Sequence, residues 1–445
     1  MITSTLWTGK TFGVFGLART GKSVIAALTA SGATALAWDD GEAARAAFAG
    51  ELTDLHTADL SKLDAMIVSP GVPHDAPLFR RAVAARIPVI GDIELFAQAR
   101  PGLPPHKVVA VTGTNGKSTT AALIHHMLVA AGIPARLGGN IGAPILSEEP
   151  LPDGGVYVLE LSSFQLELTY SLVSDVAVLL NITPDHLDRH GTMAAYAAAK
   201  ARLFAMQIPA DFAVVGQDDR ISRDIGNEAV ARVIPISAAT RLGEGVSVTG
   251  GRLVFGGVDE GAQADWPALA GPHNGQNAAA AVAAALVLGL DRPTIARGLA
   301  TYPGLPHRME RVGEVAGVAY VNDSKATNPT STAPALAAFP HVHWIAGGLA
   351  KTDELDACLP FLGHVRAAYL IGAAAPVFAR ILDGRVPVVM AATLDHAVAL
   401  AAAAARPGDT VLLSPACASY DQFTDYAARG AAFRSQVEAL RGSQP

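Results

Sequence analysis

Short apolar runs alternate with longer amphipathic stretches along most of the chain. Thr11–Phe15, Thr34–Trp38 and Ala65–Val68 have the length of strands, and a glycine turn followed by a helical pattern over Lys22–Ala30 comes after the first. Strands that alternate with helices are typical of βαβ units and a parallel sheet. The pattern therefore predicts an α/β unit at this end of the chain.

The same alternation returns twice, each time after a segment rich in proline and glycine. These two segments are Arg100–Pro105 and Tyr302–Pro306. Such residues stop both helices and strands, so the segments are expected boundaries. We predict three α/β domains, at residues 1–102, 103–303 and 304–445.

The second and third units show strand and helix patterns of their own. Strands expected in the second unit are Val108–Val111, Tyr157–Leu161 and Val176–Leu180. Its expected helices are Ser118–Ala131, Met193–Phe204 and Gln276–Leu288. In the third unit we expect strands near Ala319–Asn322, His343–Ala346, Ala368–Ile371 and Thr410–Leu413. Ligands of open α/β sheets bind at the carboxyl ends of strands, so polar residues that follow these runs are candidates for a site.

Composition narrows the class of protein. Of the 445 residues 50% are hydrophobic, but no apolar run reaches the ~18–20 residues that span a membrane, and the first residues lack an export signal. Two cysteines provide neither a disulfide framework nor zinc-ligand spacing. A net charge of −7 without a basic cluster is unfavourable for binding nucleic acid or anionic lipid. We expect a cytoplasmic monomer with no nucleic-acid or membrane partner.

The strongest motif is a glycine-rich loop between an expected strand and an expected helix. Small residues let backbone N–H groups face a phosphate, the helix N-terminus adds a partial positive charge, and Lys117 adds a full one. Ser118 or Thr119 can offer a hydroxyl to Mg²⁺. Val111 stands where the usual P-loop has its first glycine, so this loop is shorter. Its residues are Gly113, Thr114, Asn115, Gly116, Lys117, Ser118 and Thr119.

A second glycine loop, Gly16–Gly21, also follows a strand and opens a helix. In a dinucleotide fingerprint the middle glycine lets the backbone approach a pyrophosphate, but here that position is Ala18. Asp39, near the end of the next strand, could hold a ribose hydroxyl. A nucleotide diphosphate other than NAD fits this loop about as well as NAD, and simple packing of helix on strand is the alternative.

Two polar clusters at strand ends and one lysine are candidates for the chemistry. Glu160 lies inside an apolar strand, where an unpaired carboxylate would be costly, so it needs a cation such as Mg²⁺ or a salt bridge. Asp185 and His186 follow another apolar strand and are also candidates for a metal site. Mg²⁺ prefers oxygen ligands, so on chemistry alone His186 is better interpreted as a residue that contacts a metal ligand or caps a helix. On residue type alone Lys200, which shares a helix face with Tyr196, is a surface lysine. It could bind metal only as a carbamate formed with CO₂.

Several segments together resemble one family, in order and over essentially the whole chain. The chain resembles the Mur ligases of peptidoglycan synthesis, which share the phosphate loop with folylpolyglutamate synthases. Gly91–Phe96, Asn322–Asn328 and Ser414–Phe423 resemble the family members that add D-glutamate. The other matching segments are Gly113–Thr119, Leu159–Gln165, Asn181–Asp188, Ala199-Lys200, Gly304–Arg308 and Leu413–Ser419.

The resemblance implies a fold and a reaction. The fold would comprise a Rossmann-like N-terminal domain for a UDP-sugar, a central P-loop-type ATPase domain, and a Rossmann-like C-terminal domain for an amino acid. The reaction would join D-glutamate to UDP-N-acetylmuramoyl-L-alanine through an acyl phosphate, with ATP and two Mg²⁺ sites. It also implies that Lys200 carries a CO₂-derived carbamate, which reverses the surface interpretation.

The resemblance also implies the roles of individual residues. Catalysis would depend on Lys117, Glu160, His186 and Lys200. ATP would be bound by the loop Gly113–Thr119 with Asn274, Asn277, Arg308, Asp323 and Lys325, supported by His307. Magnesium would be held by Ser118, Thr119, Glu160, His186 and Lys200. The UDP substrate would contact Arg19, Thr20, Asp39, Ser69, Gly71 and Asn140. D-glutamate would contact Thr327, Lys351, Ser419 and Tyr426.

Four other functions remain open on the sequence. A sister ligase for another amino acid, or a folylpolyglutamate synthase, would share the ATPase centre and differ at Thr327, Lys351 and Ser419. A nicotinamide-dependent dehydrogenase could be argued from Gly16–Gly21, but Ala18 and the second phosphate loop are unfavourable for it. A regulatory ATP-binding module would not require the metal-binding residues.

Overall fold

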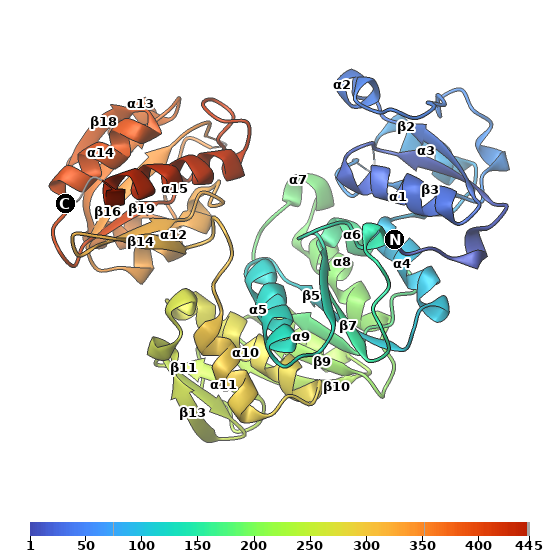
Figure 1. Cartoon of the computed structure of the whole chain (residues 1–445), viewed down its shortest axis with the longest axis horizontal. Coiled ribbons are helices and arrows are strands. Elements are labelled where there is room, and N and C mark those ends of the chain that lie inside the picture. The colour runs from blue at the N-terminus through green and yellow to red at the C-terminus, as the bar shows by residue number, and fades with distance from the viewer. Residues whose placement is uncertain (74, 351, 443–445) are drawn as a thin grey trace. The chain divides into compact units, whose positions relative to one another are not determined.

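The computed structural model describes residues 1–73, 75–350 and 352–442 (Figure 1). Over these residues the chain forms three sheets with helices packed on them, which confirms the predicted α/β class. Contacts divide the chain into two compact units. Unit 1 comprises residues 1–263 and 275–300, and unit 2 comprises residues 264–274 and the chain from 301 onward.

The first sheet of unit 1 is parallel throughout and has the strand order β2-β1-β3-β4. Every residue of β3 is buried, as expected for a parallel strand that is covered on both faces. Its strands are β1 (Thr11–Phe15), β2 (Thr34–Trp38), β3 (Ala65–Val68) and β4 (Val89–Ile90). Its helices are α1 (Arg19–Ala30), α2 (Glu42–Ala46), α3 (Pro77–Ala84) and α4 (Asp92–Ala99).

The second sheet of unit 1 has the strand order β13-β12-β11-β10-β9-β8-β5-β7-β6. It is parallel from β6 to β11, and β12 and β13 add an antiparallel edge. The parallel strands are β5 (His106–Thr112), β6 (Ala135–Gly139), β7 (Gly155–Glu160), β8 (Val176–Leu179), β9 (Phe212–Gly216), β10 (Arg232–Ser237) and β11 (Val246–Thr249). The edge strands are β12 (Arg252–Phe255) and β13 (Val258–Ala262).

Seven helices are assigned in the part of the chain that carries this sheet. They are α5 (Lys117–Ala130), α6 (Ser163–Glu167), α7 (Leu187–His190), α8 (Met193–Ala205), α9 (Arg220–Glu228), α10 (Pro272–Val287) and α11 (Arg292–Thr301). Helix α5 follows β5 directly, so the phosphate loop lies at the carboxyl end of a buried strand.

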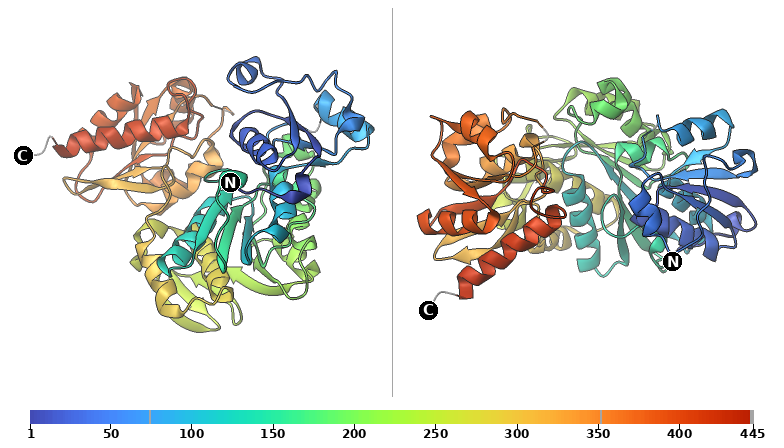
Figure 2. Two further views of the ribbon diagram at one scale, coloured as in Figure 1. Left: turned by 45° about the vertical axis from the view of Figure 1, so that its right-hand side comes forward. Right: turned by 90° about the horizontal axis from the view of Figure 1, so that it is seen from above.

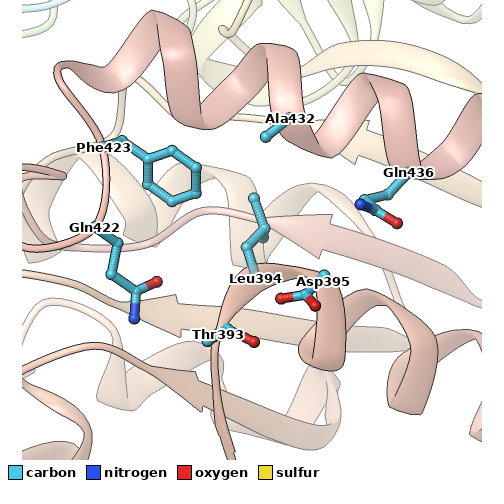
Figure 3. A pocket seen from close by; sticks show the side chains of 7 residues that line it. All are labelled: Thr393, Leu394, Asp395, Gln422, Phe423, Ala432 and Gln436. Atoms are coloured by element: carbon cyan, nitrogen blue, oxygen red, sulfur yellow. The ribbon is translucent and has the colours of Figure 1, made fainter.

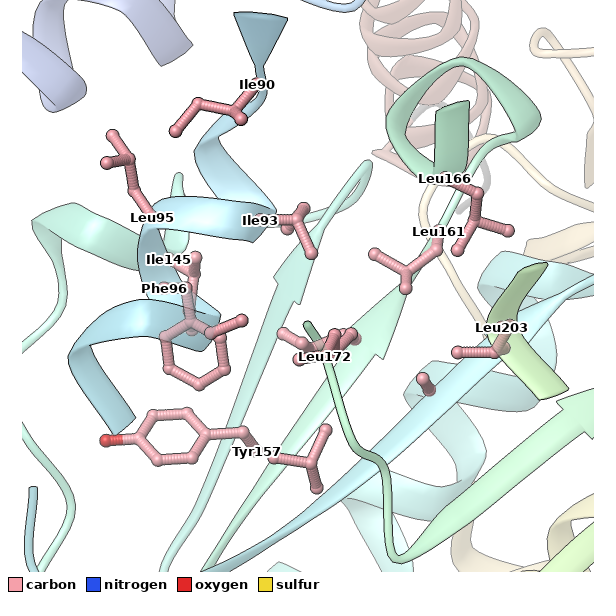
Figure 4. Packing of buried hydrophobic residues seen from close by; sticks show 14 of the residues in the cluster. Ile90, Ile93, Leu95, Phe96, Ile145, Tyr157, Leu161, Leu166, Leu172 and Leu203 are labelled. Atoms are coloured by element: carbon pink, nitrogen blue, oxygen red, sulfur yellow. The ribbon is translucent and has the colours of Figure 1, made fainter. Parts of the chain in front are cut away.

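One hydrophobic cluster joins the two sheets of unit 1, and α4 lies within it (Figure 4). Ile93, Leu95 and Phe96 of α4 are fully buried, and the Phe96 ring meets the edge of the Tyr157 ring with centroids 5.0 Å apart. Leu161 and Leu172 complete the cluster from the side of the second sheet. The first sheet is therefore fixed to the second through an apolar helix.

Unit 2 contains the third sheet, with strand order β14-β15-β19-β16-β17-β18. It is parallel except for the β14/β15 pair, and α15 packs against β14, β15 and α14 (Figure 2). Its strands are β14 (Glu310–Val315), β15 (Val318–Asn322), β16 (Val342–Gly347), β17 (Val365–Ile371), β18 (Val388–Ala392) and β19 (Thr410–Leu413). Its helices are α12 (Pro329–Ala338), α13 (Ala375–Leu382), α14 (Leu394–Ala404) and α15 (Tyr426–Gly442).

The predicted strands all form, and several elements are longer than predicted. Helix α1 begins at Arg19 rather than at Lys22, and α10 begins at Pro272 rather than at Gln276. None of the described helices has both the length and the apolar character needed to cross a bilayer.

Candidate active site

The phosphate loop joins β5 to α5, and Gly116 lies at the N-cap of that helix. Its φ of +87° is in the left-handed region, which favours glycine. A Cβ at this position would lie 2.0 Å from Oδ1 of Asn277, so a side chain would also collide with α10. Glycine leaves the helix without a side-chain cap. The amides of the first turn of α5 can therefore face a phosphate.

Asn181, which follows β8, holds the other half of the loop in place. Its backbone carbonyl accepts from the Thr114 N–H at 2.7 Å, and its Oδ1 accepts from the Asn115 N–H at 2.9 Å. Its Nδ2 donates to Gln276 at 2.7 Å. Asn181 was not predicted as a site residue. Its position just after an apolar strand could have indicated it, because polar residues at the ends of parallel strands often lie in a site.

The structure brings the two predicted catalytic lysines to one acceptor. Nζ of Lys117 donates to the Gly113 carbonyl at 2.9 Å, and Nζ of Lys200 donates to the same oxygen at 2.8 Å. Lys200 is only 1% exposed, so the interpretation of this residue as a surface lysine is wrong. Tyr196, one turn earlier on α8, covers the ammonium with its ring at 4.7 Å.

The surroundings of Lys200 disfavour its charged form. Burial, and next the positive charge of Lys117, lower the pKa of Lys200 well below its ordinary value. The carboxylates of Asp185 and Glu160 act in the opposite direction. Since a charge acts on a pKa only when it is close, these four residues form one electrostatic cluster.

Glu160 ends β7 opposite Val111 of β5, beside the start of the phosphate loop. Its Oε1 accepts from Nδ2 of Asn140 at 3.1 Å. Its Oε2 is buried and has no hydrogen-bond partner, although the residue is only 2% exposed. A buried carboxylate oxygen without a donor is unfavourable, and a cation would satisfy it. Glu160 therefore fits a metal-binding role.

His186 and Asp185 lie at the turn that begins α7. His186 has a φ of +52°, its Nε2 lies 3.5 Å from Oδ2 of Asp185, and its ring meets the edge of the Phe164 ring at 4.9 Å. Its side chain is half exposed. Across the described residues, no three His, Cys, Asp or Glu side chains cluster in a way that could hold a metal. Magnesium here would thus take further ligands from hydroxyls, phosphate oxygens or water, as Mg²⁺ commonly does.

The predicted residues for the UDP substrate gather around the two loops of the first sheet. Oδ2 of Asp39 accepts from the Leu17 N–H at 2.7 Å, so this carboxylate steadies the glycine loop. Oγ of Ser69 donates to the Gly16 carbonyl at 3.2 Å. Thr20 lies in the first turn of α1, and Gly71 is exposed in the turn after β3.

Of the two further predicted UDP residues, Arg19 connects the first sheet's part of the chain to the second's, and Asn140 lies in the second. Nη2 of Arg19 donates to the Gly142 carbonyl at 3.0 Å. The backbone N–H of Asn140 donates to the Glu160 carbonyl at 2.8 Å, so Asn140 lies beside the metal-binding candidate at the end of β7.

In unit 2 two predicted nucleotide-binding residues, Asp323 and Lys325, follow the end of β15. Asp323 is buried and accepts from Oγ of Ser414 at 2.7 Å and from the Met309 N–H at 3.1 Å. Burial raises the pKa of Asp323 to about 7. His307 has a φ of +63°, and its carbonyl accepts from the Lys325 N–H at 3.0 Å.

The predicted amino-acid residues lie near that segment, with one exception. Nζ of Lys325 donates to the Tyr426 hydroxyl at 3.0 Å and lies 4.1 Å from the centre of that ring. Ser419 is buried and its carbonyl accepts from the Phe423 N–H at 2.8 Å. Thr327 is half-buried just before α12. Lys351 lies outside the described residues.

The remaining predicted residues are placed as follows. Asn274 and Asn277 are buried on α10, and Oδ1 of Asn277 accepts from Oγ1 of Thr120 at 3.4 Å. Ser118 is buried and Thr119 is half-buried in the first turn of α5, and Arg308 is half-buried after His307.

Unit 2 also has a cavity of about 380 Å³ between the start of α14 and the middle of α15 (Figure 3). Among the described residues predicted to bind D-glutamate, which are Thr327, Ser419 and Tyr426, none lines this cavity. The residues that line it are Thr393, Leu394, Asp395, Gln422, Phe423, Ala432 and Gln436.

Two protein-family models match this chain. The Mur ligase middle domain matches residues 111–285, and the glutamate ligase domain of the Mur ligases matches residues 307–417. Together they span more than half of the chain and include the phosphate loop, Glu160 and Lys200. The chain therefore belongs to the Mur ligase family, a family of ATP-dependent ligases.

Relatives that match over the full length narrow this class. The UDP-N-acetylmuramoylalanine--D-glutamate ligase of Novosphingobium aromaticivorans is 54% identical, over 99% of this chain and 97% of that protein. The ligase of the same name from Sphingopyxis alaskensis is also 54% identical, over 99% of this chain and 100% of that protein. These relatives place the chain in the D-glutamate branch of the family.

Solved structures confirm the fold. The UDP-N-acetylmuramate-alanine ligase of Thermotoga maritima has a TM-score of 0.60 at 17% identity and covers 98% of this chain and 100% of its own. A MurF ligase from the same organism, in complex with ADP, has a TM-score of 0.60 at 17% identity and covers 97% and 96%. At this identity the likeness shows the architecture alone.

Proposed function

We propose that this ligase joins D-glutamate to UDP-N-acetylmuramoyl-L-alanine, with ATP cleaved to ADP and phosphate through an acyl-phosphate intermediate. The observation that carries the proposal is the sharing of the Gly113 carbonyl by Lys117 and Lys200, beside the buried carboxylate of Glu160. Full-length relatives with this D-glutamate activity in their names support the choice of amino acid.

The central difficulty of the first step is electrostatic. A substrate carboxylate must attack the terminal phosphate of ATP although both groups are anionic. Lys117 lies within the loop that would hold the phosphates, and the first-turn amides of α5 add partial positive charge. Groups fixed in advance stabilise the charge of a transition state more effectively than mobile water does.

Magnesium would be held by Glu160 and His186, with the hydroxyl of Ser118 or Thr119 and oxygens of the phosphates. When bound, Mg²⁺ neutralises charge on the phosphate oxygens. The unpartnered Oε2 of Glu160 supports this assignment, because the residue already uses Oε1 to accept from Asn140. Asn140 thereby fixes the orientation of the carboxylate.

A carbamate on Lys200 would complete a second metal site. Its formation requires a neutral amine: the nitrogen lone pair adds to the carbon of CO₂, a C–N bond forms, and one proton leaves to solvent. Burial and the neighbouring charge of Lys117 favour the neutral amine. The product is an anion, so its pairing with Lys117 is attractive where the ammonium was repelled.

The second step needs an uncharged amine on D-glutamate. His186 or Asp185 is the candidate base, since both lie just before α7 in the segment that follows β8 and Asn181. Attack of the nitrogen on the acyl carbon forms the amide bond, and phosphate leaves with the C–O bond electrons. Thr327, Lys351, Ser419 and Tyr426 would hold the amino acid. The UDP part would bind at Arg19, Thr20, Asp39, Ser69, Gly71 and Asn140.

The proposal is tested by an acceptor series. The protein is incubated with ATP, Mg²⁺ and UDP-N-acetylmuramoyl-L-alanine, and phosphate release is compared for D-glutamate, L-glutamate, L-alanine and meso-diaminopimelate. We expect turnover with D-glutamate and a UDP-linked product heavier by one glutamate residue in mass spectrometry. Turnover with another acceptor and none with D-glutamate would contradict it.

A further inference from the structure

Arg189 links the candidate metal-binding segment to a substrate loop of the first sheet. It lies on α7, three residues after His186. Its Nη1 donates to the Pro70 carbonyl at 3.1 Å and to the Val72 carbonyl at 3.0 Å. Both acceptors belong to the turn that follows β3, whose residues Ser69 and Gly71 are proposed to contact the UDP substrate.

That turn is also tied to the glycine loop of the first sheet. The Val72 N–H donates to the Ser69 carbonyl at 3.0 Å and closes the turn, and the Ser69 N–H donates to the Phe15 carbonyl at 3.0 Å. Oγ of Ser69 donates to the Gly16 carbonyl at 3.2 Å. An arginine that is hydrogen-bonded to this turn therefore helps to fix the positions of both loops proposed to hold the substrate.

The guanidinium of Arg189 is itself held from the side of the second sheet. It lies 4.0 Å above the Phe164 ring, and Nη2 lies 3.6 Å from Oε2 of Glu167. Glu167 Oε1 lies 3.2 Å from Nδ1 of His190, and Nε2 of His190 lies 3.0 Å from Oγ of Ser163. The side chain of His190 is 1% exposed. Arg189 is thus supported by a partly buried network of side chains on α6 and α7.

We infer that Arg189 is a positioning residue that sets the 69–72 turn, and with it the UDP-linked substrate, relative to the segment carrying His186. This inference rests on the proposed function, since it takes the turn to be a substrate loop. Nη1 of the guanidinium donates to both carbonyls, while Nη2 faces Glu167 and the guanidinium carbon lies over the Phe164 ring. An ammonium has a single nitrogen, so it cannot make these contacts from separate atoms of one rigid plane. Lysine at this position would keep the charge but lose the geometry.

Arg202 provides a matched control within the same part of the molecule. Its guanidinium lies 4.9 Å from the Tyr170 ring, Nε donates to the Leu166 carbonyl at 2.8 Å, and Nη2 donates to the Thr169 carbonyl at 2.6 Å. Its partners all lie in the segment between β7 and β8. Arg202 therefore repeats the stacking and the two carbonyl bonds of Arg189 without a bond to the substrate turn.

The test compares Arg189→Ala, Arg189→Lys and Arg202→Ala in the full-length protein. For Arg189→Ala we expect the KM for UDP-N-acetylmuramoyl-L-alanine to rise on the order of tenfold or more, with the KM for ATP within about twofold of wild type. Arg189→Lys should show an increase of the same kind, and Arg202→Ala should leave both KM values near wild type. Equal changes for Arg189→Ala and Arg202→Ala, or equal changes for both substrates, would overturn the inference.

A binding measurement separates this inference from the proposed function. Calorimetric titration with UDP-N-acetylmuramoyl-L-alanine, without ATP, should show weaker binding for Arg189→Ala and Arg189→Lys than for Arg202→Ala. If wild type binds this substrate but ligates no D-glutamate, the proposed function fails while the affinities still decide the role of Arg189. If Arg189→Ala does not fold, Arg189→Lys carries the comparison, and an unchanged affinity in that variant overturns the inference.

Discussion

At the scale of single residues, Lys200 holds its amine where a positive charge is unfavourable. It is buried, it shares the Gly113 carbonyl with Lys117, and the Tyr196 ring covers it. A buried ammonium next to a second positive charge would not stabilise the fold, so a purely structural role does not explain this lysine. A neutral amine that can add CO₂ is stabilised by the same surroundings, which is why we assign Lys200 to the chemistry.

Replacing Lys200 by alanine should therefore remove turnover rather than stability. We expect Lys200→Ala to lower kcat by at least about 100-fold, the scale observed when one fixed charge-stabilising group is lost. Added bicarbonate should not restore activity, since no amine remains. Phosphate release at saturating substrates, with a thermal unfolding curve for folding, measures this.

Lys107→Ala is the matched control, because Lys107 is an exposed lysine at the opposite end of β5 from the phosphate loop. Its kcat should equal that of wild type. Full activity of Lys200→Ala would exclude this lysine from the mechanism.

Asp323 makes a pH-dependent contribution to stability that can be isolated. Its pKa is about 7 in the fold because of burial, above its ordinary value of 3.8. The folded state therefore binds the proton more tightly than the unfolded chain does. The stabilising contribution is fully present below about pH 4 and is lost as the pH rises to about 7.

Asp323→Asn should remove this loss. We expect the Tm of the variant, relative to that of wild type, to increase as the pH rises from 5 to 8. The corresponding difference in the free energy of unfolding should be a few kcal/mol at most. Calorimetric unfolding at several pH values gives the comparison. Asp395→Asn, a change at an exposed carboxyl whose pKa is lowered by its hydrogen bonds, should show no such gain. Parallel curves for Asp323→Asn and wild type would contradict the argument.

At the scale of elements, the buried parallel strands were predictable because each is a continuous apolar run. The antiparallel edge was not predicted, although its signal is present in the sequence. Gly250-Gly251 and Gly256-Gly257 flank β12, and all four glycines have positive φ values. Two such residues between strands are typical of a tight hairpin. These hairpins are marked by their turns rather than by the short, partly polar strands.

The candidate site was predictable where the neighbouring sequence is distinctive: Lys117 follows a glycine loop at the start of a helix, and Glu160 ends an apolar strand. Lys200 could not be placed from residue type, because burial of a helix face depends on what packs on it. Asn181 and Arg189 act through backbone carbonyls and amides from distant segments. No sequence pattern pairs the two partners of such a contact, although the place of Asn181 after an apolar strand marked it as a candidate.

The start of α1 depends on a close approach of two backbones. A Cβ on Gly21 would lie 1.8 Å from the Gly16 carbonyl oxygen, which no relaxation of a side chain can relieve. Gly21→Ala should therefore push α1 away from the glycine loop. We expect a loss of about 1–3 kcal/mol of stability and weaker binding of the UDP substrate.

Urea unfolding and calorimetry of the Gly21→Ala protein measure these two effects. Gly102→Ala serves as the control, because a Cβ there would meet no atom within 4 Å. Wild-type stability and affinity in the Gly21→Ala protein would show that the helix tolerates the shift.

At the scale of the whole molecule, the residues proposed to bind the two substrates belong to different units. Those proposed for the UDP substrate all lie in unit 1: Arg19, Thr20, Asp39, Ser69, Gly71 and Asn140. The described residues proposed for D-glutamate lie in unit 2: Thr327, Ser419 and Tyr426. Each unit has hydrophobic clusters of its own. A ligand that contacts one unit should therefore stabilise that unit locally.

Hydrogen–deuterium exchange can locate each ligand separately. A ligand stabilises the folded state of the segments that it contacts, so the amides there open and exchange more slowly. UDP-N-acetylmuramoyl-L-alanine alone should therefore slow exchange in peptides covering residues 16–21, 69–72 and 138–142. D-glutamate alone, at high concentration, should slow exchange in peptides from residue 322 onward and leave those three segments unchanged. UMP, added as a control for the uridine part, should protect the segments of the first sheet more strongly than residues 138–142. Protection of residues 322–442 by the UDP substrate alone, with none at 16–21, would reverse the assignment of the two substrates to the two units.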